Sequence, residues 1–254
     1  MYPRIVTDSK VFPRFSGKER DIHRLGFKSG EIDLSGVGYQ NKWAVVQFGR
    51  GRQSWGAGNE IQLTLSDNSN AYDYGMLALD FGKFRSRYIH GWLENRDSTN
   101  RYLSAKGFEW TNRKNLIVSL SEVIIYSGPQ RAFDLSYLNP LSPHLEVELN
   151  DRQNVLGTGS ANAIWQISLD YLFNSLIRVS GNIIIDELIL DKIEKDNGKE
   201  NGVGFSLRTV WTPIRDKNIV SLFLSIAQIG THTLKHENGN NNFVHRGHPL
   251  GWIH

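Results

Sequence analysis

Apolar and polar side chains alternate along much of this chain. Between residues 163 and 173, every second residue is large and apolar, whereas Gln166, Ser168 and Asp170 occupy positions between them. A period of two places successive side chains on opposite faces of a β-strand, and no stretch keeps a convincing helical period. The pattern therefore predicts an all-β protein.

Strands are predicted wherever this alternation is bounded by clusters of Gly, Asn, Asp or Ser. Short turns between consecutive strands indicate an antiparallel meander, which loops near residues 126–161 and a polar stretch at 191–200 interrupt. Tight turns that alternate with long polar loops are typical of barrels whose ends face different compartments. The predicted strands are 29–39, 42–50, 59–66, 74–82, 84–94, 101–111, 115–125, 162–173, 176–187, 203–212 and 218–230.

The hairpin predicted at 162–187 has one face rich in aromatic and β-branched residues and one face with polar and charged residues. In a soluble sandwich the apolar face would form the core, but here its aromatic residues suggest contact with lipid. We therefore expect an antiparallel transmembrane β-barrel, or an incomplete part of one, in this chain. Trp165, Ile167, Ile183 and Ile185 should point outward, and Gln166, Asp170, Arg178 and Asn182 inward.

The composition excludes several further classes of protein. The 254 residues are 39% hydrophobic, which excludes a disordered chain, and no run of eighteen apolar residues predicts a transmembrane helix. The absence of cysteine excludes disulfides and thiol catalysis. The formal net charge of +3 is spread without a basic stripe, so nucleic acid is not an expected partner.

The first residues of the chain do not resemble a secretory signal peptide, because Met1-Tyr2-Pro3-Arg4 is not followed by an apolar segment. An outer-membrane protein is made with such a signal, so either the N-terminal part of the natural chain has been removed or the membrane interpretation is wrong. Residues 1–28 are expected to be an irregular leader or the remnant of an upstream region, and residues 29–254 to hold the barrel strands and loops.

Several segments carry more information than generic turns. They are residues 48–58 followed by 65–68 and Asp73, then 137–140, and then 245–251. In this order and spacing they resemble the Wzi capsule assembly family of Gram-negative outer-membrane proteins. Residues 101–110 and 120–126 fit the same pattern, so the resemblance covers roughly residues 42–251.

The resemblance implies a β-barrel of about eighteen strands with a helical plug and a lectin-like role in holding capsular polysaccharide. It implies no catalytic centre, no metal and no cofactor; the partners would be surface polysaccharide and outer-membrane lipid. This chain would be an internal fragment or a shortened relative. A porin-like channel for sugars or small solutes is the leading alternative, and a glycoside hydrolase comes third.

The same segments supply the candidate polysaccharide-binding residues. An indole face stacks well on a pyranose, and a planar guanidinium suits the carboxylate of a uronic acid. A structural turn at Gly56 and Gly58, with the indole at a membrane interface, is an equal alternative for Trp55. The candidates, which we expect to gather at one end of the barrel, are Arg50, Arg52, Trp55, Asp67, Asn68, Tyr137, Asn139, His245 and Arg246.

Carboxylates and histidines leave two further possibilities. A hydrolase could draw an acid and a base from Asp67, Asp73, Glu109, Glu122, Asp170 and Asp186. The favoured interpretation is that carboxylates inside the barrel pair with Arg50, Arg52, Arg101 or Arg178. A metal site at His232, His236, His245 and His248 is less favoured than a solvated loop, because residues 238–242 are rich in asparagine.

Overall fold

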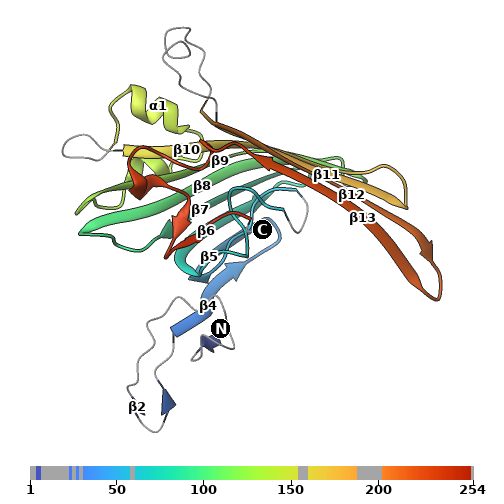
Figure 1. Ribbon diagram of the computed structural model, residues 1–254, viewed down its shortest axis with the longest axis horizontal. Coiled ribbons are helices and arrows are strands. Elements are labelled where there is room, and N and C mark those ends of the chain that lie inside the picture. The colour runs from blue at the N-terminus through green and yellow to red at the C-terminus, as the bar shows by residue number, and fades with distance from the viewer. Residues whose placement is uncertain are drawn as a thin grey trace.

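The computed structural model describes residues 4–6, 23–24, 27–28, 31–57, 61–153, 160–187 and 202–252. One large antiparallel meander sheet dominates them (Figure 1). From residue 31 onward each strand of this sheet pairs with its neighbours in the sequence, and the first strand, residues 4–6, pairs with the strand that begins at Glu31; two short hairpins among the described residues lie outside this sheet. In sheet order the strands are β1 (Arg4–Val6), β4 (Glu31–Gln40), β5 (Ala44–Gly51), β6 (Tyr72–Asp80), β7 (Phe84–Trp92), β8 (Thr99–Thr111), β9 (Leu116–Pro129), β10 (Ser160–Leu172), β11 (Ile177–Glu187), β12 (Gly202–Arg215) and β13 (Ile219–Ile229).

The all-β prediction is confirmed. Within the described residues the strand order is linear, with β1 at one edge and β13 at the other, so this sheet is curved but not closed. Of the predicted leader, the structure describes β1, which pairs with β4, and the hairpin of β2 (His23–Arg24) and β3 (Phe27–Lys28). The rest of residues 1–28, Gly58 and the polar stretch 191–200 lie outside the described residues.

The two ends of the sheet differ in their connections. Short turns at residues 41–43, 81–83, 112–115, 173–176 and 216–218 join the strands at one end. At the opposite end the connections are longer, spanning residues 52–71, 93–98, 130–159 and 188–201. The predicted alternation of tight turns with long loops is therefore confirmed.

The faces of the sheet are inverted relative to a soluble sandwich. In the β10 and β11 hairpin, Trp165 is 38%, Ile167 45% and Ile183 49% exposed on the convex face, whereas Gln166 and Asn182 are buried on the concave face. This confirms the predicted orientation of that hairpin, although Ile185 is half-buried and Arg178 is exposed. The concave face also buries apolar residues, among them Ile164 and Ile184.

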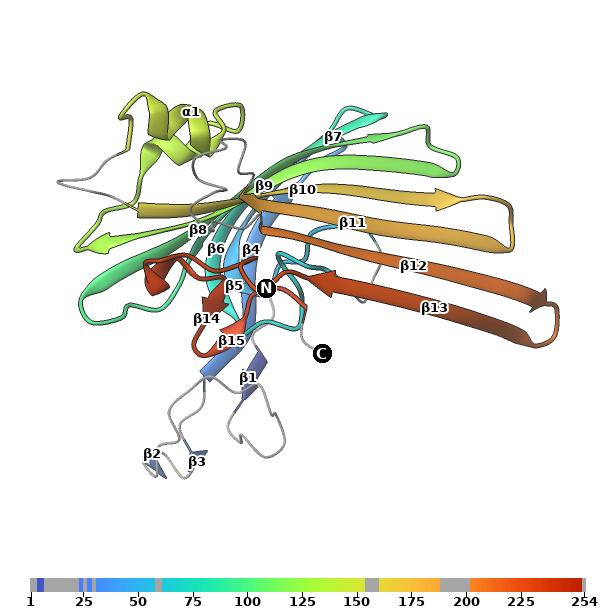
Figure 2. The same cartoon turned by 45° about the horizontal axis from the view of Figure 1, so that its top comes forward.

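The concave face is covered by segments that we call the inner layer, residues 52–57, 61–70 and 231–252 (Figure 2). The 3-10 helix η2 (Gly239–Asn241) and the short strands β14 (Val244–His245) and β15 (His248–Pro249) belong to it. Its apolar side chains complete the core against those of the sheet. The core includes Leu63, Leu65, Phe243 and Leu250 from the inner layer and Ile89, Leu103, Ile125 and Ile164 from the sheet.

The strand predicted at 59–66 is wrong. In the described part of that range, Leu65 makes an isolated bridge with Trp55, and the segment joins no sheet. Leu63 and Leu65 are fully buried, and so is Thr64, whose hydroxyl donates to Gln166 Oε1 at 2.7 Å. When a segment is enclosed between a sheet and other loops, its apolar and its polar side chains are both buried. An alternating pattern therefore does not require the segment to be a strand.

A second covering lies on the convex face and consists of residues 131–150, which we call the outer cap. It contains the 3-10 helix η1 (Leu135–Leu138) and the helix α1 (His144–Leu149), which lies on the side of the sheet opposite the inner layer (Figure 2). The helix α1 therefore lies outside the concave face, where a helical plug of the kind implied by the resemblance would lie. No helix in the described ranges is long and apolar enough to span a membrane.

Candidate functional site

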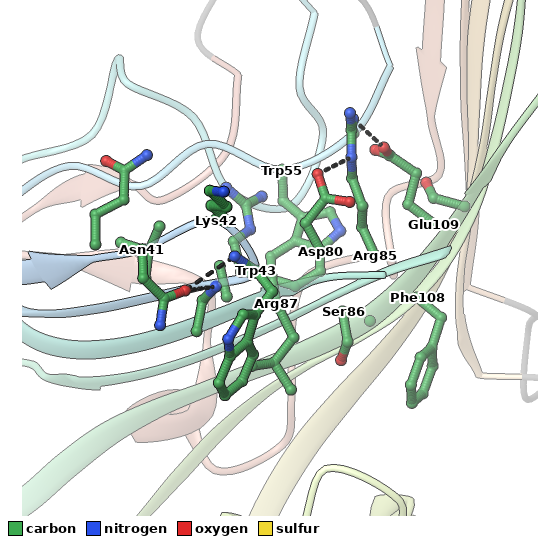
Figure 3. Close-up of a pocket in the computed structure, with 18 residues that line it drawn as sticks. Asn41, Lys42, Trp43, Trp55, Asp80, Arg85, Ser86, Arg87, Phe108 and Glu109 are labelled. Carbon is green, nitrogen blue, oxygen red and sulfur yellow. Dashed lines mark hydrogen bonds and ion pairs between the residues drawn. The ribbon is translucent and has the colours of Figure 1, made fainter. Parts of the chain in front are cut away.

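A pocket of about 410 Å³ lies between the concave face and the inner layer, near the end with short turns (Figure 3). The turn between β4 and β5, the ends of β6 and β8 and the start of β7 form its walls. Charged side chains and an indole are close together there. The lining includes Asn41, Lys42, Trp43, Trp55, Asp80, Arg85, Ser86, Arg87, Glu109 and Ser119.

An ion network crosses three strands of this pocket. Arg85 Nε lies 3.2 Å from Asp80 Oδ2, and Arg85 Nη1 lies 2.9 Å from Glu109 Oε1. These residues are directly opposite one another in the sheet register, so their side chains share one face. All three side chains are at least one third exposed, so water reaches the network.

Trp55 does not form an open platform. Its side chain is 6% exposed, and the guanidinium carbon of Arg87 lies 4.2 Å from the centre of its ring. Arg87 is held in place by donating to the Ser54 carbonyl at 2.7 Å. A Cβ at Gly107 would approach Cζ2 of the indole to 2.5 Å, so this glycine lets the ring rest on β8. The predictions of an exposed stacking surface and of an interfacial indole are both wrong, because the inner layer buries Trp55.

A different tryptophan offers an exposed ring at the pocket. Trp43 is 54% exposed in the turn between β4 and β5 and lines the pocket (Figure 3). Asn41 Oδ1 shapes this turn by accepting from the backbone N–H groups of Trp43 and Ala44 at 2.9 and 2.7 Å. The sequence signal for Trp43 was an aromatic residue inside a short polar turn between two alternating segments. This turn is not part of the segments that carry the family resemblance.

The predicted arginines are held in ion pairs. The pair of Arg178 with Asp170 on the concave face confirms the favoured interpretation, whereas Arg50 pairs on the convex face and the partners of Arg52 and Arg101 were not among the candidate carboxylates. Arg50 Nη1 lies 3.1 Å from Asp73 Oδ2, and Arg52 Nη2 lies 2.5 Å from Asp33 Oδ1. Arg178 pairs with Asp170 across the β10 and β11 hairpin. Arg101 pairs with Glu94, which sequence analysis did not single out.

Arg101 fixes the inner layer to the sheet. Its guanidinium is buried, lies 2.7 Å from Glu94 Oε1, and donates to the backbone carbonyls of Asn240, Asn242 and Val244. Glu94 Oε2 lies 2.5 Å from Nδ1 of His245, which is 2% exposed. Burial alone would raise the pKa of Glu94, but the hydrogen bond from His245 and the charge of Arg101 lower it to about 2. His245 therefore has a structural contact here and not a surface position.

Only part of the predicted shared surface exists. Arg52 Nε donates to the Ser69 carbonyl at 2.7 Å, and Asn70 Nδ2 lies 3.4 Å from the carbonyls of His245 and Arg246. The turn that carries Asp67 and Asn68 is therefore close to the segment 245–251 on the concave side. Arg50 points the other way, because its cross-strand partner Asp73 lies on the convex face.

The segment with Tyr137 and Asn139 is separated from the other motifs by the sheet, so the expectation of a single cluster is wrong for it. Tyr137 is fully buried and packs on Tyr126 with ring centres 4.8 Å apart. Tyr126 and Ile125 are adjacent residues of β9 that face opposite sides, and Ile125 packs in the core with the inner layer. Because neighbouring residues of a strand face opposite sides of the sheet, Tyr126 and the segment 137–140 that packs on it lie on the convex side.

The underside of the outer cap carries a buried polar network. Tyr137 Oη lies 2.9 Å from His144 Nδ1, and the His144 backbone N–H donates to Glu122 Oε1 at 2.9 Å. Glu122 Oε2 lies 3.3 Å from Lys106 Nζ, which also donates to the Ser142 carbonyl. Burial, with the nearby charges of Lys106 and Arg131, lowers the pKa of His144 to about 4, and burial raises that of the Tyr137 phenol.

The residues considered for a metal site and for a hydrolase are placed as follows in the structure. Among the described residues, no group of three or more His, Asp or Glu side chains is arranged to hold a metal ion. Glu109 and Glu122 are engaged with Arg85 and Lys106, and Asp186 accepts from the Leu234 backbone N–H at 2.5 Å. These carboxylates serve contacts within the sheet and between the sheet and the inner layer.

Comparison with known proteins gives no relative: no family model, curated protein or solved structure matches this chain. The family resemblance remains a prediction from the motifs.

Proposed function

We propose that this chain forms the wall of an outer-membrane β-barrel that holds a surface polysaccharide and does not cleave it. The observation that carries the proposal is the apolar convex face of the sheet. Its exposed side chains extend from β4 to β13 without a break at any strand pair. They include Val37, Phe48, Leu77, Phe84, Phe108, Leu120, Ile167, Ile183, Phe205, Leu207, Leu222 and Ile226.

Charged residues in the strands support the same orientation. In the body of β10, β11 and β12, Asp170, Arg178, Asp186 and Arg208 all alternate with convex residues and so lie on the concave face. A soluble protein would be expected to place such charges on its exposed face, whereas a barrel in lipid must keep them inside. An apolar face of this extent is far larger than the patches that soluble monomers expose.

Aromatic side chains lie at the end with short turns. Rings near this end are exposed on several successive hairpins, as in the aromatic girdle that barrels place at the lipid and water boundary. Short turns at one end and long connections at the other are also typical of outer-membrane barrels, whose short turns face the periplasm, so the pocket would bind the polysaccharide from the periplasmic side. Apart from Trp43, which lines the pocket, the exposed rings at this end are Tyr39, Phe81, Phe84, Trp110, Phe173 and Trp211.

The pocket supports sugar binding by weak contacts. The exposed Trp43 ring can stack on a pyranose, while Lys42, Ser86 and the network around Arg85 offer polar and charged partners. Each such exposed contact is modest, about 1 kcal/mol, so a polymer would be retained by several repeats binding together.

Two alternatives are less well supported. A hydrolase needs an acid and a base that are both free to act on the substrate, but Asp80 and Glu109 are both bound to the guanidinium of Arg85. A channel needs an open interior, but the inner layer covers the concave face. Ion conductance in planar bilayers that equals that of an open porin would support the channel instead.

The test compares two tryptophans in a binding assay with purified protein and an immobilised polyuronate. Trp43→Ala should weaken binding about fivefold, since loss of one stacking contact is worth about 1 kcal/mol. Trp211→Ala is the matched control, because Trp211 is similarly exposed at the same end but lies on the convex face. Equal effects of the two variants, or shortening of the polyuronate by the wild-type protein, would contradict the proposed site.

A further inference from the structure

The outer cap exposes a row of leucines. Leu141 and Leu149 are each 73% exposed, and the others in the row are Leu135, Leu138 and Leu145. Within α1, Leu145 and Leu149 are one turn apart and share the outward side. The row therefore forms an apolar outer surface of a segment that is otherwise rich in polar residues.

This row is not the side by which the outer cap packs on the sheet. Tyr137 and Val147 are fully buried and pack with Tyr126, Ile124 and Tyr102 of the convex face. His144 and Ser142, also buried, bond to Glu122 and Lys106. The inner surface of the segment is thus fixed by apolar packing and hydrogen bonds, and the leucines remain on the opposite side.

The outer cap covers one charged part of the convex face, whereas Arg50 and Asp73 lie elsewhere on that face. Lys106 and Glu122 are each 4% exposed and point to the same face as Phe108 and Leu120, which lie two residues along the same strands and are open. Without the covering, an ion pair would stand beside the apolar band. The exposed leucines begin where this band ends, so the two apolar surfaces follow one another on one side of the molecule.

We propose that the outer cap is a lipid-interface segment, with Leu141, Leu145 and Leu149 inserted at the boundary of headgroups and acyl chains. The inference rests on the proposed membrane location of the sheet. Amphipathic segments bind this boundary through buried leucines while their charges remain near water. The outward carboxylate of Glu146 is neutralised by Arg152, whose Nη1 lies 2.7 Å from both carboxylate oxygens. The outer cap thereby shields Lys106 and Glu122 from lipid.

The chain has no cysteine, so single sites can be spin-labelled without background. Nitroxides at Leu145→Cys, Glu148→Cys and Leu207→Cys would be compared in vesicles of phosphatidylethanolamine and phosphatidylglycerol. Collision rates with oxygen, which concentrates in lipid, and with a water-soluble nickel chelate would be measured. Leu207 reports the convex face of β12, and Glu148, whose side chain is 57% exposed, reports the neighbouring polar side of α1.

The label at Leu145 should collide several times more often with oxygen than with the nickel chelate, as at Leu207, and Glu148 should show the reverse. A Leu145 label that is accessible to nickel while Leu207 is in lipid would overturn this inference and leave the proposed function intact. A Leu145 label shielded from both reagents would indicate protein contact and would also overturn it. Nickel accessibility at Leu207 as well would overturn both proposals.

Discussion

Arg101 shows how a single buried charge can organise this molecule. Its guanidinium is removed from water but receives one carboxylate and three backbone carbonyls in compensation. Such a group is tolerated only when its partners are complete, because an unpaired buried charge is strongly destabilising. The partners come from the connection between β7 and β8 and from the inner layer, so this residue links segments about 140 positions apart.

Loss of Arg101 should therefore be far more damaging than loss of its neighbour Arg96. Arg101→Met keeps most of the volume but leaves Glu94 buried without its main partner, so we expect a loss of about 3–5 kcal/mol in the free energy of unfolding. Arg96→Met removes a half-exposed contact to the same carboxylate and should cost less than about 1 kcal/mol. Urea titrations of the protein in lipid vesicles provide the measurement, and similar losses for the two variants would contradict the assigned role.

At the scale of elements, the outer cap depends on one buried imidazole. His144 is neutral in the folded state, because its pKa there is about 4 against about 6.5 in an unfolded chain. Between these values the unfolded form binds more protons. The stability of the outer cap is therefore complete above pH 6.5 and falls as the pH drops towards 4.

Acidification should loosen the outer cap before it affects the rest of the sheet. A nitroxide at Leu149→Cys should show a growing mobile component in its spectrum as the pH falls from 6.5 to 4. His144→Gln removes the titrating group while keeping a polar side chain near the Tyr137 hydroxyl, so its spectrum should change little over the same range. A label at Leu207→Cys serves as the control within the sheet. An unchanged Leu149 spectrum in the wild-type background would exclude this pH dependence.

At the scale of the whole molecule, the curved sheet separates two environments. Its concave face holds the inner layer, the pocket and the ion network around Arg85, and its convex face holds the apolar band, the outer cap and the ion pair of Lys106 with Glu122. Each strand contributes to both, because the period of two sends neighbouring residues to opposite sides. A substitution should therefore have opposite consequences at adjacent positions of one strand.

Charged substitutions in β12 test this separation. Leu207→Arg would place a charge on the convex face and should destabilise the protein in vesicles by about 2–4 kcal/mol if that face is in lipid. Val210→Glu places a charge on the same strand but on the concave face, directly opposite Arg178 in the sheet register, and should change stability little. Equal stability of both variants in urea titrations would indicate that water covers the convex face.

The sequence by itself determined most strands of the sheet and the faces of the β10 and β11 hairpin, but not the segment at 59–66. Alternation in residues such as Trp165 to Leu169 fixed both the secondary structure and the side that each residue faces, because strand periodicity is a local property. It also identified the arginines and the carboxylates that pair in the structure, although not every pair. Arg178 with Asp170 could be anticipated, because the two are close on one hairpin.

Only the tertiary structure decided what covers each face. Residues 61–66 alternate as a strand would, yet they lie in the inner layer, because burial between the sheet and the C-terminal segment satisfies Leu63 and Thr64 together. The same enclosure buries Trp55 and leaves Trp43 open at the pocket. The segment 137–140 lies on the opposite side of the sheet from the segments 65–68 and 245–251, because residues 131–150 pass over the convex side. These outcomes depend on contacts between residues far apart in the chain, and the local periodicity of the sequence does not predict such contacts.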